Sequence, residues 1–131
     1  MENLNLIKDK LKQYYGSDKM YTGLVKRSVY SDGMKALIDL AACYWLYDII
    51  QTEVLDVLKK KNVPDTYYFT ITSADTKCTL TLSDYNNEEL WNREIGFTTF
   101  PDGTMNLHIG YGDHGPVTHG IGIITCLPSE N

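Results

Sequence analysis

The hydrophobic period of the chain changes at Pro64, and this change limits the possible folds more than any other feature of the sequence. Before Pro64, apolar residues recur every three or four positions, which is typical of one face of an α-helix. After it, apolar and polar residues alternate, which is typical of a strand with one buried face. Proline disfavours a helical residue before it, so the helical part ends by Val63. This order predicts an α+β fold, with the helices first and the sheet second.

Two helical segments are expected before the proline. Asn3 can cap the first segment and Gly16 can end it. The Ser-Asp-Gly sequence at 31–33 is a start signal for the second segment, which carries a regular apolar stripe. Because a similar period continues beyond that stripe, residues 33–61 form either one long helix or a helix that bends near residues 51–52. The sequence leaves both open.

The alternating part of the chain predicts five strands joined by polar turns. A two-residue turn, Ala74-Asp75, makes the first two strands an antiparallel hairpin, and the first four strands follow one another as a meander. The predicted strands cover residues 67–73, 76–83, 90–100, 104–109 and 121–127. The length of 131 residues is typical of one domain. We therefore expect a single domain over residues 1–131, with two helical segments packed on one face of a four- or five-stranded antiparallel sheet.

Acidic charge is concentrated in the second half of the chain. The net charge is -5, and residues 67–131 hold eight acidic side chains against two basic ones, Lys77 and Arg93. Binding to a phosphate backbone needs a basic patch, so direct nucleic-acid binding is disfavoured. An acidic surface instead suits a protein partner with a basic surface. Solubility explains the charge as well.

Tyrosine is the residue type that solubility explains least. The chain has ten tyrosines, and tyrosine is common at interfaces because its ring gives apolar contact area while its hydroxyl tolerates water. Several of them lie near the expected ends of helices and strands or in loops. The predicted partner-binding residues are Tyr21, Tyr30, Asp84, Tyr85, Glu88, Glu89 and Tyr111.

Catalytic and ligand-binding alternatives depend on a segment rich in glycine and histidine, residues 110–120, which we expect to be a loop. His108, His114 and His119 with nearby aspartates suggest a metal-dependent enzyme, but their spacing matches no metal motif. The glycines suggest a small-molecule or nucleotide site, but the phosphate-loop pattern is missing. We therefore expect no enzyme activity, no cofactor and no metal, and both alternatives stay open.

The cysteines and the longest apolar stretch indicate where the protein works. Cys43, Cys78 and Cys126 are odd in number and far apart, so we expect buried, reduced thiols rather than a disulfide framework or a zinc site. The apolar stretch 36–50 is short for a membrane span and contains two aspartates. The amino terminus has no secretory pattern. These features predict a soluble, cytoplasmic protein without membrane contact.

Five segments spread over most of the chain carry a resemblance to a known family. They are Tyr15-Gly16-Ser17, Tyr30-Ser31-Asp32-Gly33, Ala42–Ile49, Ile95–Pro101 and Leu127–Glu130. In these segments the chain resembles a family of small bacterial proteins of unknown function, carried by plasmids, phages and other mobile elements. It departs from the family pattern at Asn131, where an aromatic residue is usual, and in its longer glycine-histidine segment.

The resemblance implies a compact α+β unit and supplies no catalytic residue. Small acidic proteins of mobile elements often block host defence machinery, and some relatives in this family look like anti-CRISPR inhibitors. The resemblance therefore implies a non-enzymatic, protein-binding inhibitor, a candidate anti-CRISPR protein whose partner is an RNA-guided nuclease. Formation of a homo-oligomer stays open.

Overall fold

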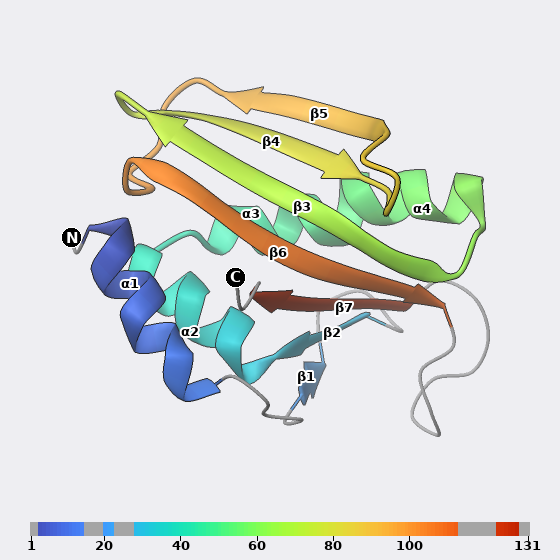
Figure 1. Cartoon of the computed structure of the whole chain (residues 1–131), viewed down its shortest axis with the longest axis horizontal. Helices are drawn as coiled ribbons and strands as arrows, with labels where there is room; N and C mark the ends of the chain where they lie inside the picture. Colours follow the sequence, from blue (N-terminus) through green and yellow to red (C-terminus); the bar gives the residue numbers. More distant parts are fainter. Residues whose placement is uncertain (1–2, 15–19, 23–27, 113–122, 129–131) are drawn as a thin grey trace.

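The structure is a computed structural model that describes residues 3–14, 20–22, 28–112 and 123–128. In these residues, α-helices cover one face of a seven-stranded sheet (Figure 1). The helical elements are α1 (Leu4–Leu11), a 3-10 turn (Lys12–Tyr14), α2 (Asp32–Ala41), α3 (Tyr44–Ile49), a π-helical turn (Ile50–Val54) and α4 (Leu55–Lys61). The strands are β1 (Met20–Thr22), β2 (Ser28–Ser31), β3 (Asp65–Ala74), β4 (Lys77–Ser83), β5 (Glu89–Ile95), β6 (Gly103–Gly112) and β7 (Ile123–Pro128).

The predicted α+β class is confirmed, and so is its antiparallel sheet. The strand order is β1-β2-β7-β6-β3-β4-β5, and the five strands from β7 to β5 are antiparallel to their neighbours. The short strands β1 and β2 extend the sheet beyond the five predicted strands through one parallel pair, β2 with β7. Their residues lie in a segment of mixed polarity, so the sequence gives little periodic signal there.

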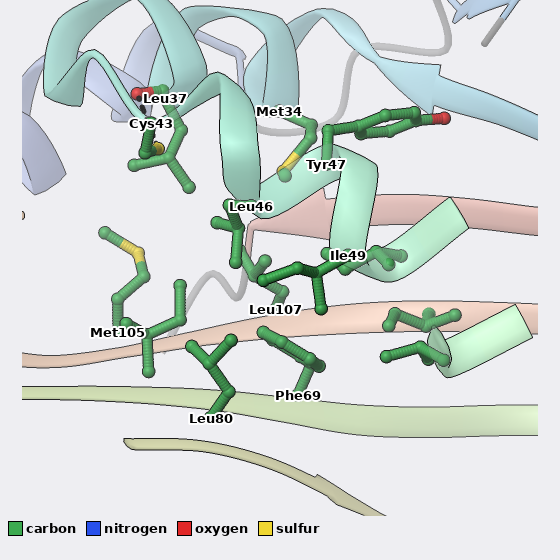
Figure 2. Close-up of a cluster of buried hydrophobic side chains, with 14 of the residues drawn as sticks. Met34, Leu37, Cys43, Leu46, Tyr47, Ile49, Phe69, Leu80, Met105 and Leu107 are labelled. Atoms are coloured by element: carbon green, nitrogen blue, oxygen red, sulfur yellow. Dashed lines mark hydrogen bonds between the residues drawn. The ribbon is translucent and has the colours of Figure 1, made fainter. Parts of the chain in front are cut away.

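Side chains from the helices and the sheet meet in one core. Alternate residues of β3 are buried, including Tyr67, Phe69 and Ile71, while the residues between them face away from the helices. Figure 2 shows Leu46 and Ile49 of α3 turned toward the sheet side chains in this core. Apolar and polar residues therefore alternate after Pro64 because the helices cover one face of the sheet, as the sequence predicted.

Both predicted helix starts are confirmed by their caps. The Asn3 side chain accepts a hydrogen bond from the backbone N–H of Leu6, with the two atoms 2.9 Å apart. The Ser31 hydroxyl oxygen accepts one from the backbone N–H of Met34 at 3.1 Å. Each bond satisfies a donor that the first helical turn leaves without a partner in the helix. The predicted end of the first segment, Gly16, lies outside the described residues.

The second helical segment is neither one helix nor bent only where the sequence suggested. It is interrupted at Ala42, which ends α2 in the left-handed conformation with φ 51°, and α3 begins two residues later. Near the expected bend the chain forms the π-helical turn, Ile50–Val54. The extra residue in that turn lets Ile49, Ile50 and Gln51 all be buried in succession. Packing against the sheet thus overrides the regular helical period.

The predicted meander is wrong at its fourth strand. The strand β6 pairs with β3, with Ile71 opposite Met105, and it does not follow β5 at the edge. The reason is burial: β6 carries buried side chains at alternate positions and needs neighbours on both sides, whereas β5 is mostly polar and suits an edge. The third strand also ends early, at Ile95 rather than Phe100, and the hairpin turn is Asp75-Thr76, one residue later than predicted.

Candidate functional site

A tight turn joins β4 to β5, and its geometry depends on Asp84. The Asp84 side chain is only 7% exposed. Its Oδ1 atom accepts hydrogen bonds from the backbone N–H groups of Asn86 at 2.9 Å and Glu88 at 3.0 Å. The Asp84 backbone N–H donates to the Glu88 carbonyl, and the Asp84 carbonyl accepts from the Asn87 N–H, each at 3.0 Å. Asp84 therefore shapes the turn, and the prediction that it contacts a partner directly is corrected to this structural role.

The same turn holds two predicted contact residues in solvent, and a third follows at the start of β5. We call residues 84–88 the acidic turn. Tyr85 is 62% exposed at its tip, and Glu88 is exposed where the turn enters β5. Glu89 is exposed at the first position of β5, where its Oε2 accepts a hydrogen bond from the Asn92 side chain at 3.0 Å. These exposed side chains give the turn and the start of β5 a negative charge and a tyrosine ring on a backbone that Asp84 holds in place.

Tyr111, predicted as a contact residue, lies in the core instead. It is 1% exposed on β6, and burial raises the pKa of its phenol above the ordinary value. Its hydroxyl has no hydrogen-bond partner among the described residues. Its position near a glycine-rich segment suggested a loop tip, but β6 extends to Gly112 and carries the ring inward. Tyr111 is therefore not available for contact in this fold.

Tyr21 and Tyr30 form a second, separate aromatic site on β1 and β2. Their rings stack with centroids 5.6 Å apart, and Tyr30 meets the buried Tyr47 ring edge-on at 4.7 Å. The ammonium group of Lys35 lies 4.8 Å from the centroid of Tyr21. Five strand spacings separate β2 from β5, which is about 24 Å. The predicted residues are thus divided between opposite ends of the sheet and do not form one surface.

The most exposed aromatic side chain of the described residues was missed by sequence reasoning. Phe97 is 89% exposed in the loop between β5 and β6, which we call the aromatic loop, residues 96–102. Its neighbours Thr98 and Phe100 are buried. The Thr98 N–H donates to the carbonyl of Thr76 in the β3–β4 turn at 2.8 Å, and the Phe100 N–H donates to the Thr98 hydroxyl at 3.0 Å. The loop backbone is therefore anchored while the Phe97 ring points into solvent.

Exposed acids accompany β5 along its length. Glu88 and Glu89 lie at one end, and Glu94 lies near the other. Arg93 is the basic residue of β5, and its guanidinium forms an ion pair with Glu53 of the π-helical turn. Its charge is therefore compensated on the helix side of the sheet. The β5 side of the molecule combines negative charge with an exposed aromatic ring at each end.

A model of a family of unknown function (DUF6876) matches residues 5–131. The chain belongs to this family. The part of the resemblance that concerns a family of unknown function is thereby confirmed. No curated protein and no solved structure matches the chain.

The metal and nucleotide alternatives for this DUF6876 chain depend on residues that the structure largely leaves undescribed. His114 and His119, with most of the predicted loop 110–120, lie outside the described residues. His108 lies on β6, where its ring meets Tyr68 edge-on at 5.4 Å. Within the described part of the chain, no three His, Cys, Asp or Glu side chains are grouped so that they could hold a metal ion.

Two of the predicted buried thiols are found in this DUF6876 structure. Cys43 and Cys78 are free and buried, and burial raises the pKa of Cys43 from 9.0 to about 12. A thiol in this state is a poor nucleophile, because the thiolate is the reactive form. Cys126 lies on β7, and its side chain is outside the description. Among the helices that the structure describes, none has both the length and the apolar composition that crossing a membrane requires.

Proposed function

We propose that this DUF6876 protein acts without catalysis, by binding a partner protein that presents a basic surface, and that the binding inhibits the partner. The observation that carries the proposal is the acidic turn. Its backbone is held by the buried Asp84 carboxylate while Tyr85 and Glu88 project into solvent, with Glu89 beside them. Such a surface needs little ordering on binding, and its charge speeds encounter with a cationic partner.

The narrower form of the proposal is an anti-CRISPR role in the cytoplasm of a host cell, for a protein encoded by a mobile element. It rests on the family resemblance together with the charge of the molecule. An RNA-guided nuclease holds its nucleic acids in a positively charged channel. A rigid acidic surface can compete with phosphates for part of such a channel, so the protein would block the nuclease both sterically and electrostatically.

A binding experiment tests the broader proposal. The protein is used to isolate a partner from host lysate, and association and dissociation rates of the purified pair are measured at low and at moderate salt. We expect the double variant Glu88→Lys/Glu89→Lys to slow association by about tenfold and to reduce its salt dependence, with a smaller effect on dissociation.

The matched control is Asp9→Lys/Asp56→Lys, which changes the net charge equally. Both control residues are exposed on helices, in ion pairs with Lys12 and Lys60 that contribute little to stability. If the two double variants slow association equally, the acidic turn is not the binding site. If salt and both variants leave the rate unchanged, electrostatic recognition is refuted.

The anti-CRISPR form has its own test. Guided DNA cleavage by a purified RNA-guided nuclease from the host is measured with the protein in molar excess, and again with the Glu88→Lys/Glu89→Lys variant. We expect cleavage to fall with the original protein and to recover with the variant. Unchanged cleavage with the original protein would remove the nuclease as the target while leaving the binding proposal to its own experiment.

A further inference from the structure

The outer side of β5 is a second part of the same surface, and its backbone offers a way to bind. We propose that β5 accepts an extended segment of the partner as an added strand, and that this segment alternates basic and apolar residues. The inference rests on the proposed function, because it names the form in which the basic partner is bound.

The first step of the argument is the edge itself. The strand β5 is the last in the sheet order and pairs with β4 on one side. No other strand of the described residues pairs with its outer side, so a row of backbone N–H and C=O groups faces outward over seven residues, about 23 Å. A strand that adds to such a row gains main-chain hydrogen bonds along its length.

The second step is the choice of occupant. Edges of this length commonly carry charges that prevent pairing between copies, and here most of the exposed charges are negative. Glu88, Glu89 and Glu94 are exposed at the start of this strand and along it, while the Arg93 charge is compensated by Glu53. Two copies of this edge would therefore repel one another. The same carboxylates attract a segment with Lys or Arg residues, so charge favours a cationic strand over a second copy of this chain.

The third step concerns the two faces of the added strand. In neighbouring strands, side chains on the same face of the sheet contact one another. On the helix face, Trp91 and Ile95 are only half-buried, and the Trp91 ring stacks on Phe69 with centroids 6.2 Å apart. Apolar side chains on this face of an added strand would complete their cover. On the opposite face, Glu94 is exposed, and a basic side chain of the added strand would neutralise its charge. Apolar and basic residues therefore alternate along the added strand.

The fourth step is the position of the exposed aromatics. Tyr85 lies just before β5 and Phe97 just after it, so both rings are close to the ends of an added strand of about seven residues. Phe97 directly precedes the buried Thr98, whose backbone N–H is bonded to the β3–β4 turn. An apolar residue at one end of the segment can therefore pack on the Phe97 ring without reordering the loop.

Short peptides test this inference without the natural partner. The probe is an eight-residue peptide of alternating lysine and valine, titrated into isotope-labelled protein at low salt. We expect amide chemical-shift changes centred on residues 89–97, and hydrogen exchange of the outward-facing β5 amides slowed about tenfold near saturation. Two control peptides have the same charge: one is methylated on every backbone nitrogen, and the other has its lysines and valines in two separate blocks.

We expect both control peptides to bind at least about tenfold more weakly than the probe, because one lacks the backbone donors and the other lacks the alternation. The variant Phe97→Ser should weaken the probe several-fold, while Leu6→Ser, which removes an exposed apolar side chain from α1, should leave it unchanged. Strand addition is refuted if the methylated peptide binds as well as the probe, if the shifts lie elsewhere, or if no binding is seen. A dimer of the free protein that protects β5 would refute the choice of occupant.

The two proposals fail in different experiments. Suppose that the probe and its methylated form bind equally, while Glu88→Lys/Glu89→Lys slows association with the natural partner. The proposal of binding through the charged surface is then supported, and strand addition is refuted. The opposite result is that the probe pairs with β5 while neither double variant changes the association rate with the natural partner. Strand pairing is then a property of the edge alone, and the proposed function is refuted.

Discussion

Removal of the Asp84 carboxylate should loosen the acidic turn and lower the stability of the whole protein. In Asp84→Ala, the backbone N–H groups of Asn86 and Glu88 lose a charged acceptor at 2.9 and 3.0 Å. A hydrogen bond to a charged group contributes about 1.5–3 kcal/mol, and an unsatisfied buried donor costs a similar amount. Because these two amides are only partly buried, water replaces part of the loss. We therefore expect the free energy of unfolding to fall by about 2–4 kcal/mol.

Urea unfolding followed by circular dichroism measures this change, which corresponds to a midpoint lower by about 1–2 M at an ordinary dependence on urea. Asp84→Asn keeps one acceptor oxygen without the charge, so it should lose only about 1 kcal/mol. Glu88→Lys/Glu89→Lys should stay within about 0.5 kcal/mol of the original protein, because both side chains are exposed. If Asp84→Ala also stays within about 0.5 kcal/mol, the buried carboxylate does not hold the turn, and the separation of structural and contact acids is refuted.

Three further predictions test the surroundings of the site. Phe97→Ser should leave the melting temperature unchanged because the ring is 89% exposed, whereas Phe100→Ala should lower the free energy of unfolding by about 3–4 kcal/mol; equal effects would contradict the anchored loop. The folded state keeps the Cys43 proton up to a pKa of about 12, whereas the unfolded thiol releases it near 9.0. Stability from this thiol is therefore full below pH 9.0 and declines by about 1.4 kcal/mol per pH unit toward about 12, and unfolding titrations of Cys43→Ala should show a slope smaller by this amount. Thr76→Gly should raise stability by about 1 kcal/mol in thermal unfolding, since the β-branched Thr76 has φ 66° in its turn; a loss would show that its side chain outweighs the strain.

Local signals account for the parts of the fold that the sequence predicts. A cap needs only a side chain and an amide three residues ahead, so Asn3 and Ser31 could be identified without knowledge of the rest of the molecule. The alternation through Cys78, Leu80 and Leu82 likewise reports one buried face, and all three are buried. Both kinds of signal are set by a few neighbouring residues, which explains why they survive in the structure.

Partner choice between distant strands leaves no comparable local signal. The pairing of β6 with β3 joins Phe69 to Leu107 across 38 positions, and it decides that Tyr111 points into the core rather than into a loop. The turn at Asp75-Thr76 was displaced by one residue for a related reason. A β-branched residue is unfavourable at positive φ, so propensity argued against the position that the register of the two strands requires.

At the candidate site, the side chains that are exposed are likewise decided by the burial and the hydrogen bonds of nearby residues. In the aromatic loop, Thr98 and Phe100 are buried and their backbone N–H groups are hydrogen-bonded, whereas Phe97, just before them, is 89% exposed. In the acidic turn, the Asp84 carboxylate accepts hydrogen bonds from backbone amides. Fewer acidic side chains are therefore available to a partner than the number of acidic residues suggests. The side chains available to a partner are therefore the charged and aromatic ones of the segment, except those that are buried or that hold the backbone by hydrogen bonds. On the β5 side, the available groups are the rings of Tyr85 and Phe97, the carboxylates of Glu88, Glu89 and Glu94, and a row of backbone groups with which no described strand pairs.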